Sequence, residues 1–266
     1  MSNNITVGIP YHQGTQPEHL RQSIESVLNQ TLLPKRLILI QNGDVSEAIR
    51  AVALSASSDL VKIDHLFVEA QGLPIALNES IRQTRTKYYA RMDSDDIAMP
   101  ERFALQYNFL ESNPDISILG GWAREFSTEE GPAQGSLKEM PTDKNLMHEW
   151  FHYRNPFIHS TIMFRMSIFR ELGYYDERFT TDQDLQLWGR AIKHGTGIAN
   201  IPEALIYFRT DNMLAKRSRL DAVWRQIKAR YAVWTPSIRL NILKIAALFF
   251  RLTPKSFRAM GYKYFR

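Results

Sequence analysis

The stretch Tyr88-Tyr89-Ala90-Arg91-Met92-Asp93-Ser94-Asp95-Asp96 sets an apolar run of strand length directly against a run of acids. Other predicted strands precede it: the apolar runs at residues 5–10 and 37–40, and a third strand near 63–68. Apolar residues at helical spacing fill the intervals, around 20–33, 45–54 and 73–84. Strands that alternate with helices over short connections predict an α/β domain with a mostly parallel, doubly wound sheet and flanking helices. The second half of the sequence is less regular: we expect strands over 116–119 and 160–164 and a loop over 131–141.

Polar side chains follow three of these predicted strands. The clusters are Tyr11-His12-Gln13, Gln41-Asn42-Gly43 and the acidic run Asp93-Ser94-Asp95-Asp96. In doubly wound sheets, ligands bind beyond the carboxyl ends of the strands. We therefore expect the three clusters to line a single cleft.

The acidic run is the first candidate for chemistry. Three carboxylates within four residues repel one another unless a positive group lies among them. On an extended segment Asp93 and Asp95 point to the same side, because the side-chain period of a strand is two. Both would then offer hard oxygen ligands to Mg²⁺ or Mn²⁺. The alternative is that these acids only cap a turn before a helix near Pro100, but their place after a buried strand favours the metal site.

A second candidate lies at the start of a helix predicted over Gln183–His194, with Gly195 as its C-cap. Asp182 and Asp184 stand on either side of the first helical residue. A carboxylate in this position often caps the helix. The other interpretation is a general base that takes a proton from an acceptor hydroxyl. Asp184 is the candidate for that role, and Asp182 would orient it or cap the turn.

Several chemistries are excluded by what the sequence lacks. It has no cysteine, which excludes disulfides, thiolate metal sites and a cysteine nucleophile and fits a reducing compartment. It has no Gly-x-Gly-x-x-Gly or P-loop motif and no Gly-x-Ser-x-Gly elbow, which counts against dinucleotide enzymes, P-loop enzymes and α/β-hydrolases. The N-terminus enters a strand-like run almost at once, so we expect no signal peptide.

The C-terminal region differs sharply in charge from the rest. Residues 209–266 hold 14 Lys and Arg against two acids, whereas residues 1–208 hold 19 basic and 26 acidic residues. Apolar and aromatic residues recur in this region at helical spacing, and the apolar run 240–252 is shorter than the roughly 20 residues that span a bilayer. We expect an interfacial helix on an anionic membrane surface; a helix packed on the domain and an oligomer contact are the alternatives. No recognition motif points to nucleic acid.

The order of several short motifs resembles that of the family 2 glycosyltransferases, which have the GT-A fold. The matching motifs are Pro10-Tyr11-His12-Gln13, Gln41-Asn42-Gly43, Gly72 to Asn78, Asp93 to Asp96 with Pro100-Glu101-Arg102, Gly173 to Asp176, Gln183-Asp184, Leu187 to Arg190 and Ile201 to Arg209. Each motif is weak alone, but the ordered set covers about residues 5 to 209. The resemblance implies an inverting, metal-dependent enzyme of the bacterial polysaccharide type.

The resemblance also implies a role for each matching residue. Pro10, His12 and Asn42 would border the nucleobase of a nucleotide-sugar donor, and Asp93 would meet its ribose or the metal. Asp95 would bind the Mg²⁺ or Mn²⁺ ion, and Asp184 would be the catalytic base. Gly72 and Arg91 complete the expected donor-binding set, although Arg91 is also placed to pair with Asp93 or Asp96.

Three residues depart from the family pattern. His12 stands where the family has tyrosine, Asn42 where it has aspartate, and Gln183 where it has glutamate. An amide at Asn42 offers a donor as well as an acceptor to a base edge. A UDP-sugar is the favoured donor, and a GDP- or dTDP-sugar remains open.

These features together predict a GT-A catalytic domain over 1–208 and a basic helical region over 209–266. The acceptor implied by the resemblance is a hydroxyl of a polyprenyl-diphosphate-linked saccharide, and the expected location is the cytoplasmic face of the bacterial inner membrane. The sequence does not indicate an oligomeric state. Two other functions stay open: an inactive family member that acts as a membrane scaffold, and a sugar nucleotidyltransferase. The latter would need a glycine-rich basic loop that Tyr11 to Gly14 does not provide.

Overall fold

In the computed structural model, which describes residues 4–211 and 220–252, a nine-stranded sheet forms the centre of the molecule. Its strand order is β3-β2-β1-β4-β8-β6-β9-β5, with β7 paired to β6. The strands are β1 (Ile5–Tyr11), β2 (Arg36–Asn42), β3 (Lys62–Val68), β4 (Tyr88–Arg91), β5 (Ile97–Ala98), β6 (Ile116–Phe126), β7 (Ser136–Lys138), β8 (Met163–Arg165) and β9 (Gly197–Arg209). The α-helices are α1 (Pro17–Leu28), α2 (Glu47–Ser55), α3 (Leu73–Arg82), α4 (Arg102–Ser112), α5 (Lys144–Tyr153), α6 (Ile168–Leu172), α7 (Gln183–His194), α8 (Leu220–Tyr231) and α9 (Ile238–Leu252).

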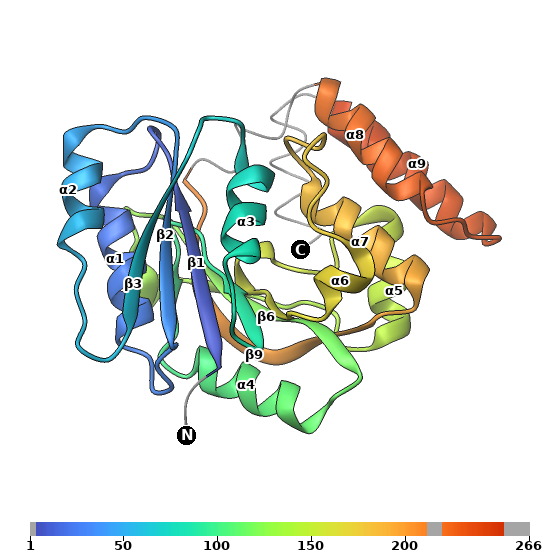
Figure 1. The fold of residues 1–266 in the computed structure, drawn as a ribbon. Helices are drawn as coiled ribbons and strands as arrows, with labels where there is room; N and C mark the ends of the chain where they lie inside the picture. Colours follow the sequence, from blue (N-terminus) through green and yellow to red (C-terminus); the bar gives the residue numbers. More distant parts are fainter. Residues whose placement is uncertain (1–3, 212–219, 253–266) are drawn as a thin grey trace.

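The first half of the sheet is parallel, as the alternation of strands and helices predicts. β3, β2, β1 and β4 lie side by side with their chains running in one direction. The helices α1, α2 and α3 connect them (Figure 1). Across the whole sheet most paired residues are in parallel register, so the predicted class, a mostly parallel α/β sheet with flanking helices, is confirmed.

Alternate residues of the parallel strands enter different cores. Val7 and Ile9 of β1 pack on one face of the sheet, in the core that also receives α1, α2 and α4. Ile38 and Ile40 of β2 pack on the opposite face with Ala76 of α3. Because both faces are covered, these strands appear in the sequence as continuous apolar runs and not as an alternating pattern.

The second half of the sheet is mixed. β8 is antiparallel to both β4 and β6, whereas the long strands β6 and β9 are parallel to each other. The sequence predicted a strand over only 116–119, but β6 continues to Phe126. Gly121 allows β9 to approach, because a Cβ there would lie 2.5 Å from the side chain of Leu205. The register between the two strands shifts at this point.

Two other predictions in this half are wrong in part. Residues 160–164 were expected to form a strand, but a 3₁₀ turn over His159–Thr161 comes first and β8 is short. Residues 131–141 were expected to form a loop, yet they contain a 3₁₀ turn over Pro132–Gln134 and the strand β7. Both errors come from short elements whose partners are distant in the sequence, so that local periodicity carries little signal.

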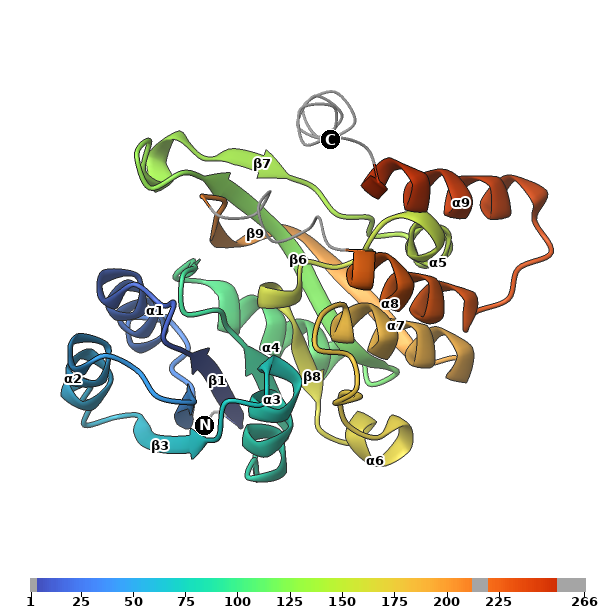
Figure 2. The same ribbon diagram turned by 90° about the horizontal axis from the view of Figure 1, so that it is seen from above.

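The C-terminal helices pack on the domain. α8 lies against α7, and α9 lies against α5 and α8 (Figure 2). The inner side of this region therefore packs on the domain, which was one of the three alternatives considered from the sequence. Several large apolar side chains remain exposed on its outer side: Trp224, Tyr231, Trp234, Ile238, Ile242, Ile245 and Phe249. None of the described helices is long and apolar enough to cross a membrane, and residues 212–219 and 253–266 of the predicted tail lie outside the description.

Candidate active site

The acidic run forms a turn directly after β4. Residues 94 and 95 are turn residues, and the backbone N–H of Asp96 donates to the carbonyl of Asp93 at 3.4 Å. The prediction that Asp93 and Asp95 lie on an extended segment is therefore wrong. Asp and Ser favour turns because their short polar side chains compete for backbone hydrogen bonds. The three carboxylates converge through this turn and not through strand alternation.

The three carboxylates of the turn fit a hard divalent cation. Asp93, Asp95 and Asp96 each offer one oxygen, and these oxygens lie within 4.8 Å of one another. Asp96 is buried, and burial together with the charges of Asp93 and Asp95 raises its pKa well above the usual value of 3.8. A cation among them would relieve this repulsion and suits the all-oxygen set. The sequence proposed Asp93 and Asp95 as ligands, and the structure adds Asp96 to the cluster.

Arg91 lies beneath the turn and contacts it. Its side chain is 3% exposed and forms an ion pair with Asp93. The sequence left open whether Arg91 pairs with an aspartate or with a ligand, and the structure gives it Asp93 as a partner. Its Nε and one terminal nitrogen are buried and donate no hydrogen bond to any of the described residues. Arg91 therefore keeps donor capacity at the site.

Arg209, the last residue of β9, holds the acidic turn from the other side. Its backbone N–H donates to the Asp96 carboxylate at 3.0 Å, and its Nε donates to the Asp95 carbonyl at 2.9 Å. Further bonds run to Thr128 and Gln22. The sequence gave Arg209 no role, although it closes the last of the ordered motifs. Its contacts cross 113 residues of sequence, so spacing alone could not reveal them.

The other predicted donor-binding residues lie at the same edge of the sheet. β2, β1 and β4 are neighbours, so the residues that follow them come together. The Thr15 hydroxyl lies 3.4 Å from that of Ser94, which links the loop after β1 to the acidic turn. The Tyr11 hydroxyl donates to Gln41 at 3.4 Å, which links the ends of β1 and β2.

Pro10 is the second-to-last residue of β1 and pairs with Ile40 of β2. His12 is the first residue after β1. His12 Nδ1 accepts the backbone N–H of Gly14 at 2.9 Å, which folds the imidazole onto its own loop. The side-chain oxygen of Asn42 is buried without a hydrogen bond from the described residues. Gly72 is the N-cap of α3, with φ +105, a conformation that favours glycine.

Asp184 lies in the first turn of α7 and is held by an amide. Its carboxylate is half-buried and accepts the Asn155 side-chain N–H at 2.6 Å. Burial and the nearby charge of Asp182 raise the pKa of Asp184 above 3.8, while Asn155 and Arg91 act in the opposite direction. A carboxylate with a raised pKa is a stronger base than an exposed one.

Asp182 occupies the N-cap position of α7 but does not cap it with its side chain. Its backbone is left-handed, with φ 60, and it is the one residue other than glycine with positive φ among the described residues. Its carboxylate accepts the Gln226 side-chain N–H from α8 at 2.5 Å. The capping interpretation of Asp182 is therefore wrong, because the side chain turns away to α8.

The charge of Arg91 acts on both carboxylate sites. Arg91 is paired with Asp93 and also acts on Asp184, whose pKa it lowers. The Tyr175 hydroxyl feels the charges of Arg91, Asp184 and Asp93 and lies 2.8 Å from His159 Nε2. The half-buried His159 has a pKa well below 6.5, because desolvation and then the charge of Arg91 disfavour its protonated form. Tyr175 therefore lies within electrostatic range of both acidic groups.

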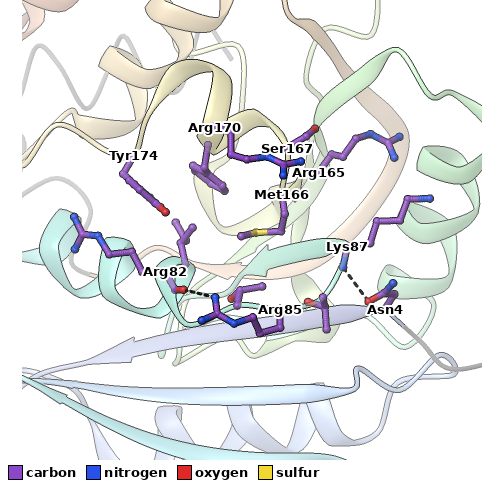
Figure 3. A pocket seen from close by; sticks show the side chains of 13 residues that line it. Asn4, Arg82, Arg85, Lys87, Arg165, Met166, Ser167, Arg170 and Tyr174 are labelled. Carbon is purple, nitrogen blue, oxygen red and sulfur yellow. Dashed lines mark hydrogen bonds between the residues drawn. The ribbon is translucent and has the colours of Figure 1, made fainter.

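A hollow of about 660 Å³ lies elsewhere on the molecule (Figure 3). Residues 84–87 line it and precede β4, whereas the acidic turn follows β4, so the hollow lies at the opposite end of that strand. Its cationic lining consists of Arg82, Arg85, Lys87, Arg165 and Arg170. Lys87 pairs with Glu111 at 2.7 Å. None of the predicted site residues lines this hollow.

The parallel half-sheet, the acidic turn at its carboxyl edge and the flanking helices define a GT-A fold, the nucleotide-sugar-binding fold of glycosyltransferases. Residues 6–173 match the profile described as "Glycosyl transferase family 2". The chain belongs to this family, and the resemblance seen in its motifs is confirmed.

Named relatives support the same class. The chain is 31% identical to the amylovoran biosynthesis glycosyltransferase AmsE of Erwinia amylovora, over 89% of this chain and 86% of that protein. It is 29% identical to the UDP-Gal:alpha-D-GlcNAc-diphosphoundecaprenol beta-1,3-galactosyltransferase of Escherichia coli, over 93% of this chain and 90% of that protein. The similarity covers nearly the whole length of each.

A solved structure has the same fold. The mannosyltransferase PcManGT of Pyrobaculum calidifontis, in complex with GDP-Man and Mn²⁺, superposes with a TM-score of 0.67 at 15% identity. The alignment covers 99% of this chain and 76% of that one. At this identity the likeness shows the fold alone.

Proposed function

We propose that this protein is a metal-dependent, inverting glycosyltransferase that extends a polyprenyl-diphosphate-linked saccharide in the synthesis of a bacterial surface polysaccharide. The observation that carries the proposal is a pair of carboxylate sites: the acidic turn, which forms an ion pair with Arg91, and Asp184 in the first turn of α7. The first suits a diphosphate with its metal, and the second suits a proton acceptor. Of the relatives named above, one is a glycosyltransferase of amylovoran biosynthesis, and the other is named for UDP-Gal and alpha-D-GlcNAc-diphosphoundecaprenol.

The donor site in this proposal lies along the carboxyl edge of the parallel strands. Pro10, His12 and Asn42 border the nucleobase, and Gly72 lets the start of α3 approach the donor closely. The buried, unpaired oxygen of Asn42 supports a base-reading role, because a donor group of the base would satisfy it. A UDP-sugar is favoured, since the Escherichia coli relative is named for UDP-Gal.

The diphosphate of the donor is held by the acidic turn in this proposal. Asp93 and Asp95 would hold Mg²⁺ or Mn²⁺ with Asp96 beside them, and Asp93 would also meet the ribose. A bound divalent cation would supply charge neutralisation for the departing nucleoside diphosphate. Arg91 lies under the turn with two buried nitrogens available, so it adds positive charge where the diphosphate develops negative charge.

Asp184 is the base in the proposed reaction. The acceptor hydroxyl gives its proton to the Asp184 carboxylate while its oxygen bonds to the anomeric carbon. The bond between that carbon and the diphosphate oxygen breaks, and the electron pair leaves with the nucleoside diphosphate. A single displacement from the opposite face inverts the anomeric configuration. Asn155 fixes the carboxylate by its hydrogen bond at 2.6 Å.

The proposed domain division is a catalytic domain over 1–208 and a basic helical region over 209–266. Arg209 at the boundary is part of β9 and supports the acidic turn. The outer side of α8, α9 and the connection between them exposes Trp224, Trp234, Ile242 and Phe249. Aromatic and aliphatic side chains in a cationic region suit the anionic cytoplasmic leaflet. Such docking would place the enzyme at the inner face of the membrane, where a lipid-linked acceptor is reached.

The test is a panel of UDP-, GDP- and dTDP-sugars measured by thermal stabilisation with Mn²⁺, followed by transfer to a polyprenyl-diphosphate-linked sugar. We expect one donor to raise Tm by mass action and to be consumed only with the acceptor. A donor that binds but never transfers would identify an inactive scaffold. Formation of a nucleotide sugar from a sugar phosphate and a nucleoside triphosphate would identify a nucleotidyltransferase.

A further inference from the structure

The inner face of α8 carries two buried polar side chains. Gln226 is 3% exposed and Arg230 is 2% exposed, one helical turn apart. Arg230 Nε donates to Gln226 Oε1 at 3.3 Å, so the two side chains act as one unit. Buried polar groups of this kind are retained only when their hydrogen bonds are satisfied. Their partners lie on the two segments that flank Asp184.

Gln226 holds the residue two positions before Asp184. Its side-chain N–H donates to the Asp182 carboxylate at 2.5 Å. Asp182 has the left-handed backbone conformation, which costs free energy for a residue with a Cβ and persists only when its surroundings enforce it. The neighbouring Arg225 donates to the Thr181 hydroxyl at 2.9 Å. Two consecutive residues of α8 thus fix the entry into α7.

Arg230 supports the opposite side of Asp184. Its guanidinium donates to the carbonyl of Phe151 and, at 3.2 Å, to the carbonyl of Arg154. The next residue, Asn155, donates to the Asp184 carboxylate. The Lys244 ammonium of α9 donates to the Arg230 carbonyl at 3.2 Å, which ties α9 to the same unit.

We propose that Gln226 is a positioning residue for the glycosyl-transfer reaction: it fixes the Asp182 backbone and so the direction in which Asp184 faces the acceptor. This inference rests on the proposed role of Asp184 as base. Gln226 touches no donor or acceptor group in the proposed reaction. An amide suits the position because it donates to Asp182 through nitrogen and accepts from Arg230 through oxygen.

The negative charge of Asp182 near Asp184 makes this position sensitive. Asp182 contributes to the raised pKa of Asp184. Because the side chain at position 226 contacts Asp182, a carboxylate there would repel the Asp182 carboxylate. The nearby cations of α8 are Arg225, which donates to Thr181, and Arg230, which donates to Gln226; both remain in every variant below. An amide placed at 182 would restore a hydrogen bond to a carboxylate at 226 with donor and acceptor exchanged.

The experiment compares Gln226→Leu with Lys228→Ala in full-length protein, using a detergent-soluble acceptor. Lys228 is exposed on the same helix, which makes it a matched control for changes in α8. We expect Gln226→Leu to lower kcat for transfer by about 10- to 100-fold, because small misplacement of a reacting group has this effect. The donor Kd should stay within about twofold of wild type, since binding groups are untouched. Lys228→Ala should change neither quantity.

Rescue distinguishes positioning from general folding. Gln226→Glu should lower kcat as Gln226→Leu does, and the double variant Asp182→Asn/Gln226→Glu should recover most of the loss. Recovery would show that the bond between the two side chains, and not the volume at position 226, sets the rate. Equal falls in kcat and donor affinity together with a lower Tm, and no recovery in the double variant, would overturn the proposal.

The Asp184→Asn variant separates this inference from the proposed function. Inactive Asp184→Asn beside a fully active Gln226→Leu would contradict the positioning role and leave the base assignment standing. An active Asp184→Asn would contradict the base assignment, and the positioning role with it. Inactive Asp184→Asn with a rescued double variant is the result that we expect.

Discussion

The acidic turn after β4 and the start of α7 both present carboxylates, but they differ in what surrounds them. In the turn, one oxygen from each of three carboxylates lies within 4.8 Å of the others. Arg91 forms an ion pair with Asp93, and Arg209 donates to the Asp95 carbonyl. At α7, one half-buried carboxylate is held by the neutral amide of Asn155. The first site holds three carboxylates that contact arginines, whereas at the second site Asp184 contacts one amide and has one carboxylate nearby, that of Asp182.

This difference shows how the same side chain can perform two tasks. A crowded set of carboxylates binds a cation well, because the cation removes their mutual repulsion. It would make a poor base once the cation is present, because the cation lowers their affinity for protons. Asp184 is joined to Arg91 only at longer range, and burial keeps its pKa raised. It can therefore accept a proton while the acidic turn holds the diphosphate.

The largest expected effect comes from removing the Asp184 carboxylate. Asp184→Asn keeps the shape of the side chain but cannot accept a proton, so transfer should slow by about 10²- to 10⁴-fold, the range for a general base. Glu203→Gln, at an exposed position on β9, is the control and should retain activity. Initial rates of transfer at saturating donor and acceptor measure both. Comparable rates for the two variants would remove Asp184 from the base role.

The next effect comes from the crowded site. Asp95→Asn, or removal of metal with a chelator, should lower activity by roughly 100-fold, because an altered ligand shell weakens metal and diphosphate together. Only chelated wild-type protein should recover fully when Mn²⁺ or Mg²⁺ is restored. Activity that survives both treatments would contradict a metal-dependent reaction.

A smaller effect is expected behind the acidic turn. Arg209→Met removes the bonds to Asp95, Thr128 and Gln22 but leaves the backbone bond to Asp96. Apparent Mn²⁺ affinity should fall by about tenfold, at the lower end of the effect of outer partners on metal sites. Arg21→Met, which removes two ion pairs on the surface of α1, should leave Mn²⁺ affinity unchanged. An unaltered Mn²⁺ titration in Arg209→Met would show that the acidic turn keeps its shape without the Arg209 side chain.

The smallest effect is a shift in the pH profile. Asp184 must be deprotonated to act, so transfer should fall as pH is lowered through its raised pKa. The Asn155 bond stabilises the charged form and lowers that pKa, so Asn155→Ala should move the acid limb of the kcat profile to higher pH. A shift to lower pH, or none, would mean that another group controls this limb.

The parallel half of the fold could be predicted because its signals are local. The strands Ile5–Tyr11, Arg36–Asn42 and Lys62–Val68 are each followed by an amphipathic helix before the next parallel strand begins. The mixed half could not be predicted as well, because β6 and β9 pair across about 80 residues and depend on Gly121 for close approach. Periodicity within a window carries no record of such pairing.

The candidate site divides in the same way. The sequence led to Asp93, Asp95 and Asp184 through their places at the end of a strand and at the start of a helix. It missed Arg209, which donates to Asp95 from 114 positions away along the chain, and Gln226, which donates to Asp182 from 44 positions away. It also predicted an extended acidic run where the structure has a turn, because strand alternation was carried past the last paired residue, Arg91.

The central claim, that the two carboxylate sites divide donor binding from proton transfer, is tested most directly by calorimetric titration of donor with Mn²⁺. The two variants to compare are Asp184→Asn and Asp95→Asn. Asp184→Asn should bind the donor within about twofold of wild type, and Asp95→Asn should bind it at least about tenfold more weakly. Equal loss of donor binding in both variants, or normal binding in Asp95→Asn, would contradict the division.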